Sequence, residues 1–135
     1  MKRLFVDSAG WIAAADAADP MNEAVREVRD EWLRDGGEFV TTDYVIDETL
    51  TILRRRISLV AAETWWKQVE ASMRIRMEWM DASRTERARA IFFKYKDKSF
   101  SFTDCTSFAV MRELRLRKAL TLNGHFRQAG FEVLP

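Results

Sequence analysis

Short apolar runs alternate with amphipathic segments along this chain, and the early runs end at polar residues. The run at residues 4–6 is closed by Asp7, and the run at residues 38–41 is followed by Asp43. Runs of this length are typical of buried strands, whereas the segments between them carry apolar residues at helical spacing. Strands that alternate with helices predict a mostly parallel, short-stranded sheet covered on both faces, which is a three-layer α/β/α sandwich.

The remaining elements follow from the same patterns and from local capping signals. Further strands are expected at residues 75–80, 119–122 and 131–134. Capping boxes at residues 83–86 and 101–104 predict two helix starts, and the second helix is apolar almost all round, which predicts burial. In a helix over residues 62–73, Trp66 lies on the apolar stripe, so Trp65 is expected on a partner-binding surface or at the rim of the core.

Length and composition bound the class of protein. The 135 residues are 47% hydrophobic and contain no low-complexity linker or repeat, so residues 1–135 are expected to form a single domain. With Cys105 as the only cysteine and His125 as the only histidine, the chain has no disulfide framework and no zinc site. No apolar run approaches the roughly 20 residues of a membrane helix, and a cytoplasmic protein with no membrane partner is expected.

The charge of the chain is unevenly distributed. The formal net charge is +1, but residues 1–60 hold 8 basic and 12 acidic side chains, whereas residues 61–135 hold 14 basic and 9 acidic ones. The first part is therefore net −4 and the second net +5. A near-neutral total does not exclude a nucleic-acid substrate, because the positive part can complement phosphates.

Several polar residues are expected at or near the carboxyl ends of strands, where open parallel sheets place their sites. They are Asp7 after the first strand, Asp43 and Asp47 after the second with Glu48 one turn into its helix, Asp104 at the start of the buried helix, and Asn123 after the penultimate strand. Converging carboxylates repel one another unless a cation neutralises them, and oxygen ligands suit Mg²⁺ or Mn²⁺. The chain has no G-x-G-x-x-G, Walker, G-x-S-x-G or C-x-x-C motif that would indicate another chemistry.

Local structure offers alternative interpretations of these acids. Asp7 and Asp104 can cap the helices that follow them. Glu48 can pair with Arg55 or Arg56 on its own helix, an interaction that contributes little when it is exposed.

Other polar residues also have more than one interpretation. The Asn123-Gly124 pair suits a tight turn with positive φ. A phosphoacceptor domain that uses Asp7 or Asp47 is a further alternative. Cys105 lies in an apolar helix and is expected to act as a small core residue rather than as a reactive thiol.

Four segments, in order, resemble the motifs of PIN-domain ribonucleases, and in particular those of VapC toxins from prokaryotic toxin–antitoxin modules. The segments are Val6-Asp7-Ser8, Asp47-Glu48-Thr49-Leu50, residues 101–108 and residues 119–126. Each motif is short, but together they extend over essentially the whole chain. The resemblance implies a PIN-like fold and a Mg²⁺- or Mn²⁺-dependent endoribonuclease. It also implies a VapB-like antitoxin partner, an RNA substrate and a homodimer.

The resemblance carries over to individual residues. Asp7, Glu48 and Asp104 match the family's first three acidic positions, which implies that they are the catalytic metal ligands. Asn123 stands where the family generally has an aspartate, and His125 stands where some members have a further acid. Because an amide is a neutral ligand, Asn123 is expected to bind metal only weakly.

This departure from the family pattern leaves a second function open. The alternative is a catalytically impaired PIN-fold module that still binds RNA or an antitoxin. His125 is expected to be a surface or locally hydrogen-bonded residue, with metal binding or proton transfer as its alternative role.

Basic residues flank the Asp104 motif. Arg112, Arg115 and Lys118 recur every three residues along a predicted helix face, and Lys98 precedes the motif. Around a metal site such residues would contact RNA phosphates, although a solvated helix face explains the same pattern.

Overall fold

The computed structural model describes residues 2–135, which contain seven helices and five strands. In chain order the elements are β1 (Arg3–Val6), α1 (Ser8–Ala15), α2 (Asn22–Arg34), β2 (Glu38–Thr42), α3 (Asp43–Arg56), α4 (Leu59–Ala71), β3 (Ile75–Glu78), α5 (Ala82–Lys94), α6 (Phe102–Glu113), β4 (Lys118–Leu120), α7 (His125–Gln128) and β5 (Glu132–Leu134).

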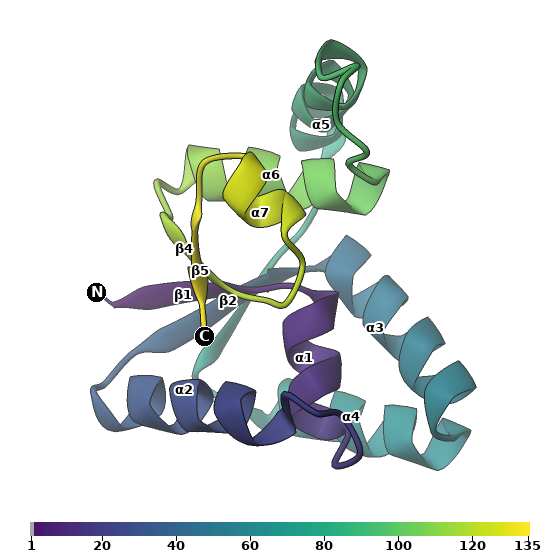
Figure 1. The fold of residues 1–135 in the computed structure, drawn as a ribbon, viewed down its shortest axis with the longest axis vertical. Coiled ribbons are helices and arrows are strands. Elements are labelled where there is room, and N and C mark those ends of the chain that lie inside the picture. Colours follow the sequence, from purple (N-terminus) through teal and green to yellow (C-terminus); the bar gives the residue numbers. More distant parts are fainter. Residues whose placement is uncertain (1) are drawn as a thin grey trace.

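The five strands form one parallel sheet in the order β3-β2-β1-β4-β5. Helices α1, α2, α3 and α4 lie on one side of this sheet and α5, α6 and α7 on the other (Figure 1). The predicted α/β/α sandwich is therefore confirmed. Within residues 2–135, every helix is too short or too polar to span a membrane.

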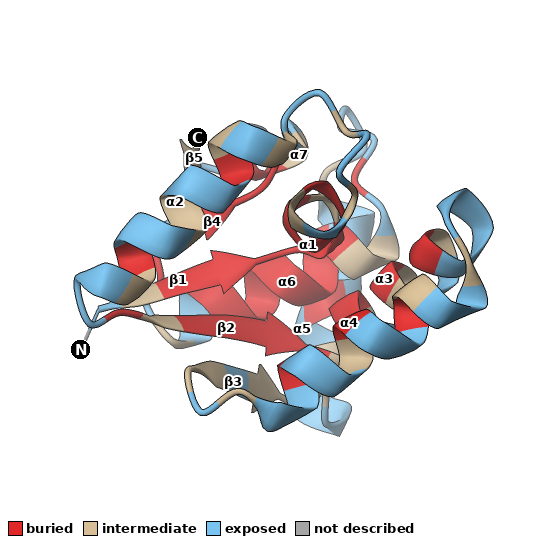
Figure 2. Cartoon of the chain, turned by 90° about the horizontal axis from the view of Figure 1, so that it is seen from below, coloured by how far each residue is buried: buried red, intermediate tan, exposed pale blue. Residues whose placement is uncertain are grey.

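The core forms on both faces of the central strand. Leu4, Phe5 and Val6 are fully buried, because successive strand side chains point to opposite faces and helices cover both. On the α6 and α7 side, the ring of Phe108 packs edge-on against Phe126, with 5.0 Å between ring centroids. Figure 2 shows β1, β2 and most of α6 as buried, which confirms the predicted burial of that helix.

Gly10 lets α1 lie directly against the end of β4. A Cβ atom at this position would come closer than 3.0 Å to the backbone carbonyl oxygen of Leu120 and would also meet the side chain of Val6. Only glycine fits this contact, which places the amino end of α1 beside the carboxyl end of β4.

Of the stripe predicted for α4, Ala62 and Val69 are buried as expected, but the placement of the two tryptophans is wrong. Trp65 is buried, with 6% of its surface exposed, and its ring packs edge-on against Trp11 of α1 at 5.8 Å. Trp66 is only half-buried, and Met73 lies beyond the end of the helix with 94% exposed. Neighbouring helical residues point about 100° apart, so docking against Trp11 selects which tryptophan enters the core.

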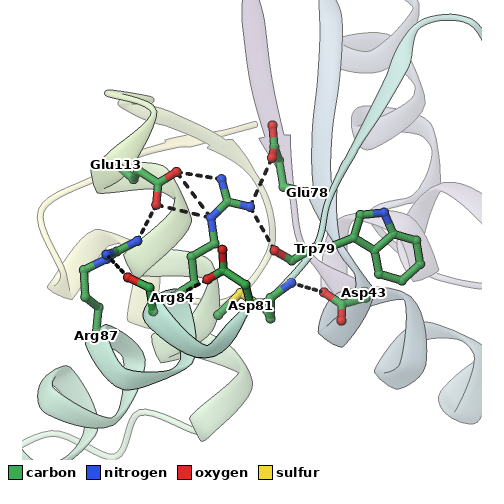
Figure 3. Close-up of polar contacts among 9 residues, drawn as sticks. Asp43, Glu78, Trp79, Asp81, Arg84, Arg87 and Glu113 are labelled. Atoms are coloured by element: carbon green, nitrogen blue, oxygen red, sulfur yellow. Dashed lines mark hydrogen bonds and ion pairs between the residues drawn. The ribbon is translucent and has the colours of Figure 1, made fainter.

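The predicted start of α5 is also wrong, whereas the capping box of α6 is confirmed. Asp81 caps α5 by accepting from the backbone N–H of Arg84 at 2.8 Å, so the box expected at residues 83–86 is not formed. Arg84 then donates to Glu78 at the end of β3 and to Glu113 of α6 (Figure 3). These bonds connect α5 with both of its neighbours.

Candidate active site

The site lies at the switch point of the sheet, where the strand order reverses between β1 and β4. The central strand β1 pairs with β2 on one side and with β4 on the other, so the connections leaving β1 and β4 separate at their carboxyl ends. Crevices at such switch points are where open parallel sheets bind ligands. Asp7 directly follows β1, and Asn123 follows β4 by three residues.

Asp7 caps α1, as its position predicts. Its carboxylate accepts from the backbone N–H of Gly10 at 3.0 Å, and only 4% of its surface is exposed. Burial raises the pKa of Asp7 to about 7, and the negative charges of Asp104 and Glu48 contribute in the same direction. The hydrogen bonds from Gly10 and from the Thr121 side chain oppose this rise in pKa. Asp104 and Glu48 therefore both lie within electrostatic reach of Asp7.

Glu48 enters the site from α3. Its carboxylate accepts a hydrogen bond from the hydroxyl of Ser8, the first residue of α1. The predicted arginine pairing is not formed by Arg56, which instead lies 3.5 Å from Asp19. Asp47 is exposed, so the neighbouring acid does not share this buried environment.

Asp104 is held at the amino end of α6. Its Oδ2 accepts from the backbone N–H of Ser101 at 3.0 Å, and its own N–H donates to the Ser101 hydroxyl at 2.9 Å. With 8% of its surface exposed, this acid is buried and forms the second half of the capping box of α6. Two further groups contact its carboxylate: Asn123 Nδ2 at 3.0 Å from Oδ1, and His125 Nδ1 at 2.7 Å from Oδ2.

The segment that carries Asn123 and His125 differs from the predicted tight turn. Gly124 has φ −61°, and the chain enters the short helix α7 at His125. Asn123 Oδ1 accepts from the backbone N–H of His125 at 3.0 Å, which stabilises this entry. The positive-φ turn is therefore wrong. The His125 side chain is half-buried and contacts Asp104, 21 residues away, so its hydrogen bond is not the local one that was expected.

The acids suit a hard divalent cation by their chemistry. Asp7, Glu48 and Asp104 offer only oxygen atoms, and Asp7 is buried where its negative charge is unfavourable without a counter-ion. As the side chains are placed, residues 2–135 include no group of three His, Cys, Asp or Glu residues close enough to hold an ion. Metal binding by these residues remains a prediction.

Two hydroxyl residues belong to this site although the sequence reasoning did not single them out. Ser8 donates to Glu48, and Thr121 lowers the pKa of Asp7 while accepting from the backbone N–H of Asn123 at 2.9 Å. Each hydroxyl residue lies one or two positions from a predicted site residue, which is the signal that could have identified it.

Two of the four predicted RNA-binding residues, Arg115 and Lys118, lie away from the acids. Lys118 begins β4 at the end opposite to Asn123, and Arg115 lies beyond the end of α6, so the predicted helix face through Arg112 is not formed. Arg115 and Lys118 instead line a groove of about 380 Å³ together with Arg3. Lys98, which pairs with Asp97 at 3.4 Å, precedes Ser99, whose hydroxyl lies 3.4 Å from His125 Nε2. RNA contact by these residues stays a prediction.

Cys105 follows Asp104 on the buried side of α6. The thiol is fully buried, and burial together with the charge of Asp104 raises its pKa to about 11. The expected role as a small core residue is confirmed, because a thiol with this pKa stays protonated near neutral pH.

We expect Asp7→Asn to stabilise the metal-free protein at pH 8. Asp7 has a pKa of about 7 when folded and 3.8 as its ordinary value, so folding takes up a proton between these pH values. Its contribution to the free energy of unfolding falls as the pH rises from about 4 to 7, by about 1.4 kcal/mol per pH unit. Asparagine remains neutral and can still cap α1.

The measurement is urea unfolding in EDTA at pH 4.5 and pH 8, with the exposed Asp30→Asn as the matched control. The increase in the free energy of unfolding caused by Asp7→Asn should be several kcal/mol smaller at pH 4.5 than at pH 8. Equal stability of parent and Asp7→Asn at pH 8 would show that the buried carboxyl does not destabilise the fold.

Comparison with known proteins identifies the family. The model of the PIN domain matches residues 4–132. The 23S rRNA-specific endonuclease VapC20 of Mycobacterium tuberculosis, in strains CDC 1551 and H37Rv, is 32% identical over 133 residues, which cover 98% of each chain.

Solved structures agree with this assignment. The crystal structure of VapC20, described as a sarcin–ricin loop cleaving toxin, superposes with a TM-score of 0.88 at 32% identity and covers 98% of this chain and 99% of that one. FitAcB from Neisseria gonorrhoeae superposes with a TM-score of 0.66 at 15% identity, with 98% and 96% covered, and shares the fold. Because both the sequence and the fold match over nearly its whole length, this chain belongs to the PIN-domain family.

Proposed function

We propose that this protein is a metal-dependent endoribonuclease that hydrolyses RNA phosphodiester bonds and is the toxin of a toxin–antitoxin pair. The observation that carries the proposal is the burial of Asp7 beside Asp104 and Glu48 at the switch point of the sheet. The relative VapC20, which matches over 98% of both chains, is a 23S rRNA-specific endonuclease. Ribosomal RNA is therefore the first substrate to test.

The three acids would hold Mg²⁺ or Mn²⁺, and each is oriented by its own neighbours. Such a cation, when bound, polarises a phosphoryl oxygen and makes a bound water more acidic. Gly10 N–H orients Asp7, and the Ser8 hydroxyl orients Glu48. Because these donors are fixed by α1, the carboxylates are positioned before RNA arrives.

We expect EDTA to abolish cleavage of ribosomal RNA by this protein. Added Mn²⁺ or Mg²⁺ should restore it, because without a cation the buried acids repel both one another and the phosphate. The measurement is primer extension across 23S rRNA after incubation of ribosomes with the protein, in EDTA and after metal is added back. Cleavage that continues at the same rate in excess EDTA would contradict metal dependence.

A second candidate function is a PIN-fold module that binds RNA or an antitoxin but cleaves poorly. It is favoured by Asn123 and His125, which donate hydrogen bonds to Asp104 where an acid would supply a further ligand oxygen. Asn123→Asp separates the two functions. A large gain in cleavage indicates an impaired parent, and unchanged cleavage indicates that asparagine suffices.

The proposal includes a VapB-like antitoxin partner, a homodimer and a cytoplasmic location, which are consistent with membership of the PIN-domain family and with an RNA substrate. Co-expression with the product of any small adjacent reading frame, followed by light scattering of the purified complex, tests the first two. A chain that is monomeric at micromolar concentration and inhibited by no neighbouring gene product would contradict them.

A further inference from the structure

We propose that Asn123 and His125 are positioning residues that hold Asp104 by hydrogen-bond donation and restrict it to a single cation. The inference rests on the proposed metal-dependent function and assigns these two side chains a role other than metal ligation. Asn123 lies in the connection between β4 and α7, and His125 is the first residue of α7. They contact opposite oxygens of the same carboxylate.

The orientation of the Asn123 amide follows from its neighbours. The backbone N–H of His125 can only donate, and it lies 3.0 Å from Oδ1, so this oxygen must accept. The amide nitrogen is therefore the atom that faces Asp104 Oδ1 at 3.0 Å, and it donates there. The amide oxygen is thus directed to the backbone of α7 rather than toward the acids.

The protonated nitrogen of the His125 ring is assigned by the same reasoning. Asp104 Oδ2 already accepts from the backbone N–H of Ser101, and Nδ1 lies 2.7 Å from it, so Nδ1 carries the hydrogen. The ring is held from two further directions. Nε2 lies 3.4 Å from the Ser99 hydroxyl, and the ring packs edge-on against Phe100 at 5.6 Å.

The number of donors limits what Asp104 can bind. An ionised carboxylate has about four lone-pair sites, two on each oxygen. Ser101 and His125 occupy both sites on Oδ2, and Asn123 occupies one on Oδ1. One site remains, on Oδ1, so Asp104 would have room for one cation but not for two, which would need a second free site.

The test compares two replacements of His125 in the full-length protein. In His125→Asn the side-chain amide can occupy the place of Nδ1 and still donate to Asp104, whereas in His125→Gln it reaches the place of Nε2. Mn²⁺ binding is measured by calorimetry on protein freed of metal, and kcat and KM are measured for RNA cleavage.

The parent should bind one Mn²⁺ per chain. His125→Gln should bind it roughly 10- to 100-fold more weakly, which is the usual effect of losing a group that orients a metal ligand. Its kcat should fall while its KM for RNA changes little, because phosphate contacts are retained. His125→Asn should stay close to the parent in both measurements, which a purely structural role of the ring would not produce.

Asn123→Asp provides a second measurement that does not depend on the His125 variants folding. It replaces the donor by a carboxylate facing Asp104 Oδ1, so the variant should bind a second, weaker Mn²⁺ and melt at a lower temperature in EDTA. A second Mn²⁺ in the parent would overturn the limit to one cation.

The outcomes separate this inference from the function on which it rests. A parent that neither binds Mn²⁺ nor cleaves RNA would reject the proposed function, and this inference with it. A parent that binds one Mn²⁺ and cleaves, with His125→Gln equal to it in both affinity and kcat, would reject the positioning role alone.

Discussion

Asp104→Asn is expected to reduce RNA cleavage by roughly 100-fold or more, the usual cost of removing a preorganised electrostatic group. The substitution removes one negative charge from the three acids proposed to hold the cation. It also presents an amide NH₂ to the donors that now surround the carboxylate, so Ser101, Asn123 or His125 loses an acceptor. The measurement is the single-turnover rate of cleavage of ribosomal RNA.

The control for Asp104→Asn is Asp47→Asn, since Asp47 is an exposed acid one position from Glu48. It makes the same chemical change outside the buried site and should cleave at the parent rate. A thermal melt checks the fold, because loss of half of the α6 capping box costs only about 1 kcal/mol. Parent-like cleavage by Asp104→Asn would show that this acid is a helix cap and no more.

Gly10→Ala is expected to destabilise the protein by about 1–3 kcal/mol or more, as overpacking does in a filled core. In an exposed helix, replacing glycine by alanine would stabilise the protein by about 1 kcal/mol, because alanine has the higher helix propensity. The change in stability expected at Gly10 has the opposite sign. The reason is the collision of the added Cβ with the backbone carbonyl of Leu120, which cannot rotate away as a side chain would. The measurement is the urea dependence of unfolding.

Gly124→Ala is the matched control for Gly10→Ala. Nothing lies within 4 Å of a Cβ at Gly124, and its φ of −61° suits any residue, so stability should be unchanged or slightly higher. If Gly10→Ala is as stable as this control, α1 does not need its close contact with β4. Cleavage should also fall in Gly10→Ala, because displacing α1 moves the N–H that binds Asp7.

Local patterns predicted several parts of the fold and the site correctly. The run at residues 4–6 became β1, and the box at residues 101–104 became the cap of α6, because both depend on residues within one turn or one strand. Asp7 was placed correctly for the same reason, because it directly follows the strand and caps the helix that begins at Ser8.

Other features could not be predicted because they depend on what packs against an element. The stripe of α4 predicted that Trp66 faces inward, but contact with Trp11 selected Trp65. The residue that caps α5 is Asp81 rather than the predicted Ser83. Hydrogen bonds from Arg84 hold this helix against β3 and α6. Charge spacing likewise could not show that Lys118 begins a strand at the end of the sheet opposite to the acids.

The sequence by itself determined the alternation of strands and helices and the placing of Asp7 and Asn123 at strand ends, because hydrophobic period and capping act over a few neighbouring residues. Only the tertiary structure decided what those residues contact. Asn123 and His125 reach Asp104 from 19 and 21 residues away, because the sheet brings the start of α6 beside the end of β4. Which atom donates and which accepts there depends on geometry across the fold, and no local spacing encodes it.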